Sequence, residues 1–281
     1  MRLSVSDNFK TNNLIDLKNN DWLDKQRVAG QIVARTLSML KQQVDSGTTS
    51  SLLELNAIAE EFITTSGATP TFKGYKGFPA GVCISVNNEL VHGIPKDYKL
   101  SQGDVVSFDL GATVEGAIAD SALTCIFGEP KSHLHSELVV STAESLYKGI
   151  KSIQVGKRLG VIGYAISKYA KNKGFGLITK YGGHGLSWNT PHAAPFVDNK
   201  SDPDHGIRIA PGLSIAIEPM LVIGSPETRT LDDGWTVVTP SIGAHFEHSV
   251  FVHEDHVEVL TWREDDLFIK NKKLYFSESN L

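Results

Sequence analysis

The sequence predicts a mixed α/β (α+β) fold in which two duplicated helix–helix–strand halves surround a central antiparallel sheet. The first observation is an apolar segment, Gly103–Phe127, whose pattern is typical of a β-hairpin. The second is an internal echo: Gly103 precedes Asp109 by six positions, and Gly212 precedes Glu218 by the same six. If the echo reflects a duplication, a pseudo-twofold axis brings the acidic residues of both halves to a common centre.

The remaining elements follow from apolar periodicity and from chain-breaking residues. Helices are predicted over 21–44, from Thr49 or Ser50 to Gly67, over 137–151 and over 161–173, and strands over 82–86, 214–218 and 244–252. The first helix is expected to bury Val28 among its apolar residues, and the second to bury Leu53 and Phe62. Residues 1–20 read as a lead-in, and the tail over 265–281 has no clear assignment.

Two aspartates, Asp109 and Asp120, interrupt the apolar strands of the predicted hairpin. If the turn is centred on Val114–Glu115, they face each other directly, with Cβ atoms roughly 5 Å apart. If it is centred one residue later, they are diagonal neighbours on one face, roughly 7–8 Å apart. Like charges across strands are destabilising, so either one carboxyl keeps its proton or a cation lies between them. The alternative is that one aspartate faces solvent near the turn.

The composition excludes several classes of protein. A hydrophobic content of 41% and a net charge of −5 are ordinary for a globular chain and give no reason to expect nucleic-acid or membrane binding. The only cysteines, Cys83 and Cys125, exclude a cysteine-based zinc module and argue against a disulfide framework. No signal peptide is visible, and no run approaches the roughly 18 apolar residues of a membrane span. We therefore expect a cytoplasmic protein.

Five polar residues stand in apolar surroundings, and together they predict a two-metal centre. They are Asp109, Asp120, His184, Glu218 and Glu247. Each acid taken alone reads better as a salt-bridged strand end, but four carboxylates and one imidazole are the ligand set of two divalent ions. Two ions about 3.5–4 Å apart leave a position for a bridging water or hydroxide, whose pKa they lower. Such an oxygen-rich site suits Mn, Fe(II), Co or Zn.

The segments around these residues resemble the type I methionine aminopeptidases in order and approximate spacing, from about residue 20 to 262. They are Val91-His-Gly-Ile-Pro95, Phe108-Asp109, Ala119-Asp120, Gly183-His-Gly185, Ile217-Glu-Pro219 and Phe246-Glu-His248. The resemblance implies a pita-bread fold, with a single catalytic domain over 21–264. It also implies that a metal-bridged hydroxide attacks the scissile carbonyl, removing the N-terminal methionine of nascent or short polypeptides when the second residue is small.

The resemblance also assigns the ligands. Asp109 is implied as a terminal ligand, Asp120 and Glu247 as bridging ligands, and His184 and Glu218 as ligands that complete the second ion's set. Glu218 is further implied to carry a proton from the attacking water to the leaving amine.

Two more histidines and an apolar pocket follow from the same resemblance. His92 is implied to meet the substrate near the scissile bond, although a loop histidine bonded to backbone is the alternative. His192 is implied to stabilise the oxyanion. The residues matching the pocket for the methionine side chain are Tyr75, Phe78, Cys83 and Trp235, for which ordinary core packing is the alternative. The other histidines are interpreted as surface, packing or ligand-supporting groups: His133, His135, His205, His245, His248, His253 and His256.

One stretch departs from the family pattern. Leu186–Pro191 is one residue longer than expected, and Pro191 falls where an aromatic pocket residue is common. Trp188 could substitute by swinging into the pocket, which is a hypothesis about the pocket's shape rather than about the metal centre.

The expected partners are the N-termini of nascent chains, and the protein is expected to be a monomer. From Lys148 to Lys180 there are eight basic residues and no acid, which would suit a contact with the ribosome. A solvated helix face is the simpler interpretation of that charge run.

Four other functions compete with this interpretation. Proline-directed peptidases and creatine amidinohydrolases share the fold but usually carry an additional N-terminal domain, and the type II methionine enzymes carry a long helical insertion. A non-catalytic binding protein on this fold would typically have lost metal ligands, whereas all five are present here.

Overall fold

The computed structural model describes residues 15–276, so the predictions for the first fourteen and last five residues lie outside the described part. Ten of the described strands form one antiparallel sheet, in the path β1-β4-β5-β14-β9-β7-β8, with β2 beside β4 and with β15 and β16 continuing from β14. Their bounds are β1 Thr69–Pro70, β2 Cys83–Val86, β4 Val105–Val114, β5 Ala117–Ile126, β7 Gly183–Ser187, β8 Thr190–Val197, β9 Ser214–Ile217, β14 Glu247–Val252, β15 His256–Val259 and β16 Lys273–Tyr275. The predicted mixed fold with a central antiparallel sheet is confirmed.

Two three-stranded sheets complete the described β-structure, in the orders β13-β10-β6 and β11-β12-β3. Their strands are β3 Glu89–Val91, β6 Gly176–Leu177, β10 Met220–Val222, β11 Arg229–Thr230, β12 Val237–Val238 and β13 Gly243–His245. A short 3₁₀ helix spans Tyr75–Gly77.

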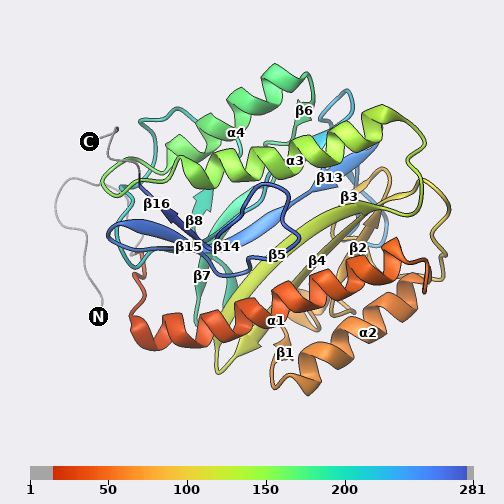
Figure 1. Ribbon diagram of the computed structural model, residues 1–281, viewed down its shortest axis with the longest axis horizontal. Coiled ribbons are helices and arrows are strands. Elements are labelled where there is room, and N and C mark those ends of the chain that lie inside the picture. Colours follow the sequence, from red (N-terminus) through yellow and green to blue (C-terminus); the bar gives the residue numbers. More distant parts are fainter. Residues whose placement is uncertain (1–14, 277–281) are drawn as a thin grey trace.

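Four α-helices cover one face of the large sheet, and Figure 1 shows α1 and α2 alongside β4 and β5, with α3 and α4 paired over the other half. Their bounds are α1 Asn20–Asp45, α2 Leu52–Thr65, α3 His133–Lys151 and α4 Gly160–Lys173. The main core lies between helices and sheet, where Leu37 of α1 and Ile162 of α4 pack with Phe108 of β4 and Ile217 of β9. The helices therefore leave the opposite face of the sheet for the site.

The two halves are arranged as the sequence echo predicts. The antiparallel pair β5–β14 lies at the centre, with β4 and β9 on its two flanks. Gly103 and Gly212, the glycines of the echo, both have positive φ values (78° and 90°) just before β4 and β9. A left-handed backbone is readily adopted by glycine, which explains why this residue opens each strand.

The register of the hairpin decides between the two alternatives for its aspartates. Val114 pairs with Ala117, so the turn consists of Glu115 and Gly116, both with positive φ, as a type I′ turn requires. Asp120 consequently faces Gly111, two residues beyond Asp109, and the two acids are diagonal neighbours. Neither faces solvent, since Asp109 is 8% and Asp120 1% exposed.

Some predicted boundaries and faces were wrong. The N-cap of α2 is Ser51, whose hydroxyl accepts from the Glu54 amide, and not Thr49 or Ser50. The helix buries Leu52, Leu55, Ala59 and Ile63, whereas Leu53 is 50% exposed and Phe62 is not in the core. The helix begins with two adjacent leucines, and its apolar residues form two interleaved sets at helical spacing. The sequence therefore fits burial of either face of the helix, and packing against the rest of the protein decides which face is buried. Val28 of α1 is likewise exposed.

Two further differences have local causes. Helix α3 begins at His133, four residues earlier than predicted, because the Ser132 side chain caps it although its first turn lacks apolar periodicity. The predicted strand over 244–252 is divided at Phe246, where the chain passes from the small sheet into the large one. Strand β16 pairs with β15 in the stretch for which the sequence pattern offered no assignment.

Candidate metal centre and substrate pocket

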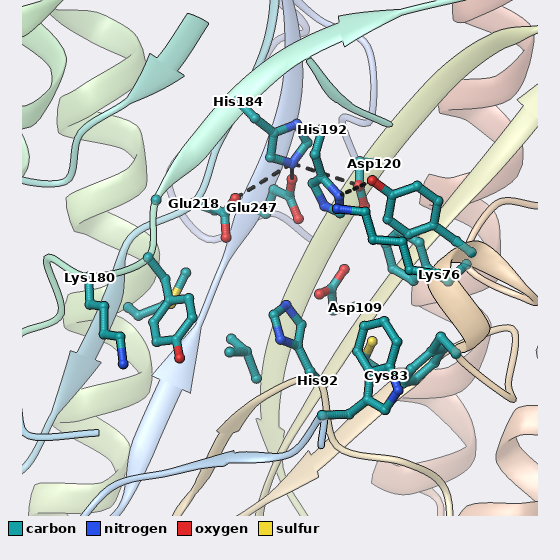
Figure 2. Close-up of a pocket in the computed structure, with 18 of the residues that line it drawn as sticks. Lys76, Cys83, His92, Asp109, Asp120, Lys180, His184, His192, Glu218 and Glu247 are labelled. Atoms are coloured by element: carbon teal, nitrogen blue, oxygen red, sulfur yellow. Dashed lines mark hydrogen bonds and ion pairs between the residues drawn. The ribbon is translucent and has the colours of Figure 1, made fainter. Parts of the chain in front are cut away.

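The five predicted ligands meet on the sheet face opposite the helices (Figure 2). Asp109 comes from β4, Asp120 from β5, His184 from β7, Glu218 from the residue after β9, and Glu247 from the start of β14. Side-chain alternation explains the orientation of the first: Phe108 and Leu110 enter the helix-side core, so the aspartate between them projects from the other face. The structure therefore brings together residues that are up to 138 positions apart in the sequence.

His184 contacts three of the carboxylates. Its Nε2 atom lies 3.6 Å from Glu218 Oε1, 3.8 Å from Glu247 Oε1 and 4.0 Å from Asp120 Oδ2. Its Nδ1 lies 3.2 Å from the carbonyl oxygen of Gly185, which can only accept, so Nδ1 carries the proton. The lone pair on Nε2 is therefore directed at the carboxylates, as in a metal-ligating histidine.

The glycines on both sides of His184 allow β7 to lie deep between its neighbours. A Cβ at Gly183 would lie 2.2 Å from the carbonyl oxygen of Ala216 in β9, and one at Gly185 would lie 2.0 Å from that of Ala194 in β8. Both distances are shorter than any real contact, so a larger residue would push β7 away. The Gly-His-Gly motif thus places the imidazole against the carboxylates of the adjacent strands.

The carboxylates lack a cation supplied by the chain. Within residues 15–276, no lysine or arginine forms an ion pair with Asp109, Asp120, Glu218 or Glu247. Burial, reinforced by the neighbouring acids, raises the pKa of Asp109, Glu218 and Glu247 well above the usual range, and burial raises that of Asp120 to about 7. One oxygen each of Asp109, Asp120 and Glu247 is buried without a hydrogen-bond partner in the described chain. Such groups indicate a missing ligand.

The donor set fits a pair of divalent cations. Ligand atoms of Asp109, Asp120 and Glu247 all lie within 4.8 Å of one another, and those of His184, Glu218 and Glu247 form a second such group. The two groups share Glu247, as expected for a carboxylate between two ions. Burial lowers the pKa of His184 to about 3, so its imidazole is neutral and available as a ligand.

A pocket of about 340 Å³ opens beside the ligands. Its wall includes the four residues predicted for the methionine side chain, Tyr75, Phe78, Cys83 and Trp235. Sequence reasoning missed other lining residues, namely Phe72, Lys76, Val91, Lys180, Tyr181, Gly182, Phe196 and Met220. Phe72 and Tyr181 lie in glycine-containing stretches close to the predicted residues Tyr75 and His184, which was a usable signal, whereas Met220 and Phe196 gave none. The buried end of the pocket is apolar: Phe72, Phe78 and Cys83 pack together, with Trp235 against them.

His92 and His192 both line this pocket, as predicted. His92 has a φ of 58°, a left-handed conformation that is costly for a non-glycine residue and is found mainly where function requires it. Its ring lies near the rings of Tyr181 and Trp235, and burial lowers its pKa. The ring of His192 is 4.5 Å from that of His184, and its Nδ1 is 3.3 Å from the Tyr75 hydroxyl.

The two histidines that flank Glu247 have different surroundings. Nε2 of His245 lies 3.5 Å from Glu218 Oε2, so this residue contacts the carboxylate oxygen of Glu218 that does not face His184. His248 points to the other side of the sheet and contacts Asp266 and Thr261. Only His245 is placed to support the metal centre.

Trp188 does not enter the pocket, so the hypothesis that it substitutes for a missing aromatic residue was wrong. Its ring packs edge-on against Trp22 of α1, with centroids 4.7 Å apart, and lies under the Lys25 ammonium group. The longer loop directs it to this face, next to the turn at Gly116. The aromatic residue that β8 does contribute to the pocket is Phe196.

A shared-carboxylate cluster on a curved antiparallel sheet, beside an apolar pocket, defines a metal-dependent hydrolase. Comparison with known proteins gives the family: the model of metallopeptidase family M24 matches residues 24–254. The chain belongs to this family, which confirms the resemblance seen in the sequence.

The relatives share most of their length with this chain. A methionine aminopeptidase of Clostridium perfringens is 43% identical over 88% of this chain and 99% of its own length, and methionine aminopeptidase 1 of Bacillus subtilis is 43% identical over 84% and 94%. The crystal structure of a methionine aminopeptidase from Thermotoga maritima superposes with a TM-score of 0.84 at 35% identity, covering 88% of this chain and 99% of that one. A prolidase from Pyrococcus furiosus, at 19% identity and a TM-score of 0.69, shares the fold alone.

No helix among residues 15–276 has the length and apolar character needed to cross a membrane.

Proposed function

We propose that this protein is a methionine aminopeptidase with two divalent cations, which removes the N-terminal methionine from short or nascent polypeptides whose second residue is small. The observation that carries the proposal is the pair of ligand groups sharing Glu247, located beside an apolar pocket of about 340 Å³. The names of the relatives support the substrate class.

The position of each residue indicates which cation it would hold. Asp109, Asp120 and Glu247 would hold one cation, and His184, Glu218, Asp120 and Glu247 the other. Bound there, the cations would polarise the scissile carbonyl and lower the pKa of a water molecule, which supplies the nucleophile near neutral pH. Cobalt, manganese, iron(II) and zinc all suit this donor set.

The pocket orients the substrate. The methionine side chain fits the apolar end between Phe78, Cys83 and Trp235, where a thioether gains contacts with aromatic edges. This places the first peptide bond at the carboxylates. We infer that only a small second residue fits there, because His92 and His192 also line the pocket beside the carboxylates.

Three side chains are proposed to act on the reacting groups of the substrate. In this proposal Glu218 takes a proton from the attacking water and delivers it to the leaving amine. His192, whose Nδ1 faces the Tyr75 hydroxyl, leaves Nε2 to donate to the developing oxyanion. His92 meets the substrate from the opposite wall.

The decisive assay measures release of free methionine from Met-Ala-Ser by the purified, full-length chain. Release should require added cobalt or manganese, stop with a chelator, and fall sharply for Met-Leu-Ser, whose second residue is large. Equal rates on both peptides, or release that survives metal removal, would contradict the proposal.

We further propose that the basic segment Lys148–Lys180 contacts the ribosome. It covers the end of α3, all of α4 and the chain up to the pocket rim at Lys180. Lys148 also pairs with Glu144, and several of the other lysines lie over tyrosine rings. Replacing Lys168 and Lys171 with glutamate should therefore weaken salt-sensitive co-sedimentation with ribosomes; unchanged co-sedimentation would rule the contact out.

A further inference from the structure

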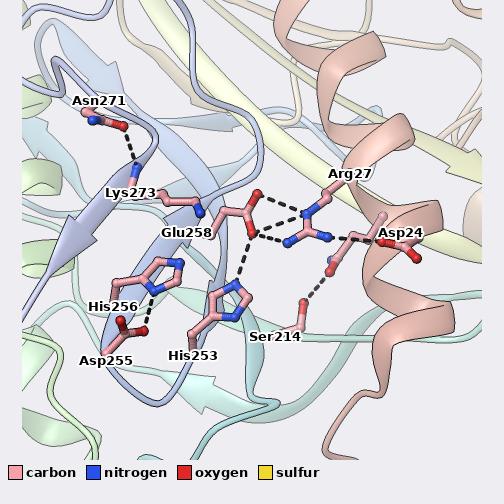
Figure 3. Close-up of polar contacts among 10 residues, drawn as sticks. Asp24, Arg27, Ser214, His253, Asp255, His256, Glu258, Asn271 and Lys273 are labelled. Carbon is pink, nitrogen blue, oxygen red and sulfur yellow. Dashed lines mark hydrogen bonds and ion pairs between the residues drawn. The ribbon is translucent and has the colours of Figure 1, made fainter.

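A second cluster of metal-binding side chains lies at the hairpin between β14 and β15 (Figure 3). His253 follows β14, and β15 supplies His256 and Glu258. One ligand atom from each of the three lies within 4.8 Å of the others. Glu247 stands at the far end of β14, so six residues of extended chain, roughly 20 Å, separate this cluster from the pocket.

His256 presents a buried ligand atom that nothing else uses. Its Nδ1 lies 2.6 Å from a carboxylate oxygen of Asp255, so Nδ1 carries the proton and Nε2 the lone pair. The residue is only 8% exposed, and Nε2 has no hydrogen-bond partner within residues 15–276. A carboxylate bonded to the far nitrogen is the arrangement that orients metal-ligating histidines.

His253 and Glu258 already share a short contact. His253 Nε2 and Glu258 Oε2 are 3.0 Å apart, a few tenths of an ångström less than the roughly 3.4 Å between two ligands on one tetrahedral ion with bonds of about 2.1 Å. A cation can therefore replace the shared proton with little movement of the backbone. Burial opposes ionisation of Glu258, but hydrogen bonds from Arg27 and His253 outweigh it and lower its pKa, so the carboxylate is charged.

The rings must move before both can bind one ion. The imidazoles of His253 and His256 are stacked, with planes within 8° and centroids 4.2 Å apart, so no point within bonding distance of both rings lies in both ring planes. His256 is held by Asp255 on one edge, with Tyr275 beside its ring. His253 has a side chain that is 22% exposed, and it is the ring that can tilt.

The surrounding charges tolerate a cation. Arg27 of α1 donates to both oxygens of Glu258, and it is also paired with Asp24 at 3.0 Å. Lys273 faces Glu258 across the β15–β16 pair. With the acids Asp24, Asp255 and Glu258 set against Arg27 and Lys273, the cluster carries a net charge of −1.

We propose that His253, His256 and Glu258 bind one divalent transition metal ion of the zinc class, at a site separate from the catalytic centre. Two imidazoles and one carboxylate are a common donor set for such ions. Because Glu258 is held by Arg27, the bound ion ties the β14–β15 hairpin to α1.

The test counts zinc ions bound by the metal-stripped, full-length chain, using isothermal titration calorimetry with Zn²⁺ alone. The unaltered protein should bind one equivalent more than the His256→Gln variant. His205→Gln is the matched control, because it removes an exposed histidine that is not part of this cluster and should keep the full stoichiometry. Equal stoichiometry in the unaltered protein and in His256→Gln would overturn the proposal.

A second variant guards against misfolding at the buried position. His253→Gln alters the more exposed ring and should lose the same equivalent, while its far-UV circular dichroism and its rate of methionine release with saturating cobalt stay unchanged. If His256→Gln fails to fold, retention of the extra equivalent in His253→Gln would by itself contradict the site. A loss of methionine release in His253→Gln would place the lost ion in the catalytic centre instead, which also contradicts it.

Discussion

Two sets of buried carboxylates, in different regions of the molecule, have opposite acidities. Asp104 accepts from Lys131 and Tyr98, and Asp266 accepts from Arg263 and contacts His248. Burial raises the pKa of each, but these charged and polar partners outweigh it and bring both values down to about 2. The carboxylates of the pocket are also largely buried, yet their pKa values are raised.

The difference shows which acids are structural. Where the chain supplies its own cation, the carboxylate is ionised and ties two segments together, as Asp266 ties the C-terminal segment to β14 through His248. Where the chain supplies none, the folded protein keeps several acids in one place at a cost in free energy. A bound divalent cation would offset this cost by neutralising the clustered acids. Four experiments test this difference between the two sets of acids.

The largest effect is expected from Glu247→Gln, which removes the carboxylate charge shared by both ligand groups. We expect kcat/KM for Met-Ala-Ser to fall by at least about 10³-fold, or about 4 kcal/mol of transition-state stabilisation, with loss of bound metal. Metal analysis and a methionine-release assay check this. Asp104→Asn is the control from the other set and should keep its kcat/KM; full metal content and activity in Glu247→Gln would refute the ligand assignment.

Asp266→Ala should have the next largest effect, on stability rather than on catalysis. It leaves Arg263, which is 4% exposed, without its carboxylate, and breaking a buried ion pair from one side costs about 3 kcal/mol. Urea unfolding measures the change, and kcat/KM of the folded variant should stay close to that of the parent. A loss below 1 kcal/mol would show that solvent or Ser121, to which Arg263 also donates, replaces the aspartate.

The two sets predict opposite pH dependences for the metal-free protein. Asp104 and Asp266 have lowered pKa values, so their contribution is complete above about pH 4 and is lost as the pH falls towards 2. The pocket acids have raised values, so the folded state binds more protons than the unfolded state, and stability falls as the pH rises from about 4 towards 7 and beyond.

Thermal unfolding checks this third prediction. Without metal, the Tm should be lower at pH 8 than at pH 5. With saturating manganese the fall should disappear, because the metal binds the ionised acids. A metal-free protein that gains stability between pH 5 and 8 would contradict the raised values.

The smallest effect is expected from two lysines at the pocket that have no carboxylate partner. Lys76 and Lys180 lie on opposite walls of the pocket, are exposed, and form no ion pair within residues 15–276. Peptides with an acidic third or fourth residue should therefore be preferred over lysine analogues, and Lys76→Glu should reduce that preference by about 3-fold at low salt. Lys171→Glu, which makes the same charge change on α4, should leave the preference unaltered. A preference that is insensitive to Lys76 and to salt would exclude an electrostatic origin.

In the β4–β5 hairpin, the sequence predicts the face of the two aspartates but not their register. Alternation along β4 and β5 identified the face of Asp109 and Asp120, but two registers were consistent with the residues. The structure selects the turn at Glu115–Gly116, because a type I′ turn joins these twisted strands without splaying them. Residue types therefore identified the ligands, whereas the ladder of hydrogen bonds decided their spacing.

The lining of the pocket could be predicted only in part from the sequence. Met220 and Phe196 reach the wall because β10 and β8 run beside the pocket, and no local pattern marks them. Trp188 was placed wrongly for the same reason, since its contact with Trp22 joins residues 166 positions apart. Which aromatic residue faces the substrate depends on how distant strands pack.

The chemistry and the local elements could be predicted from the residues alone: carboxylates and an imidazole within apolar strands, glycines where the backbone is left-handed or closely packed, and helices of recognisable period. The folded structure was needed to learn which of these groups meet, which histidines contact Glu218 and Glu258, and what shape the pocket takes. The reason is that periodicity reflects neighbours within a few residues, whereas a site is made of contacts between strands whose pairing depends on the whole sheet.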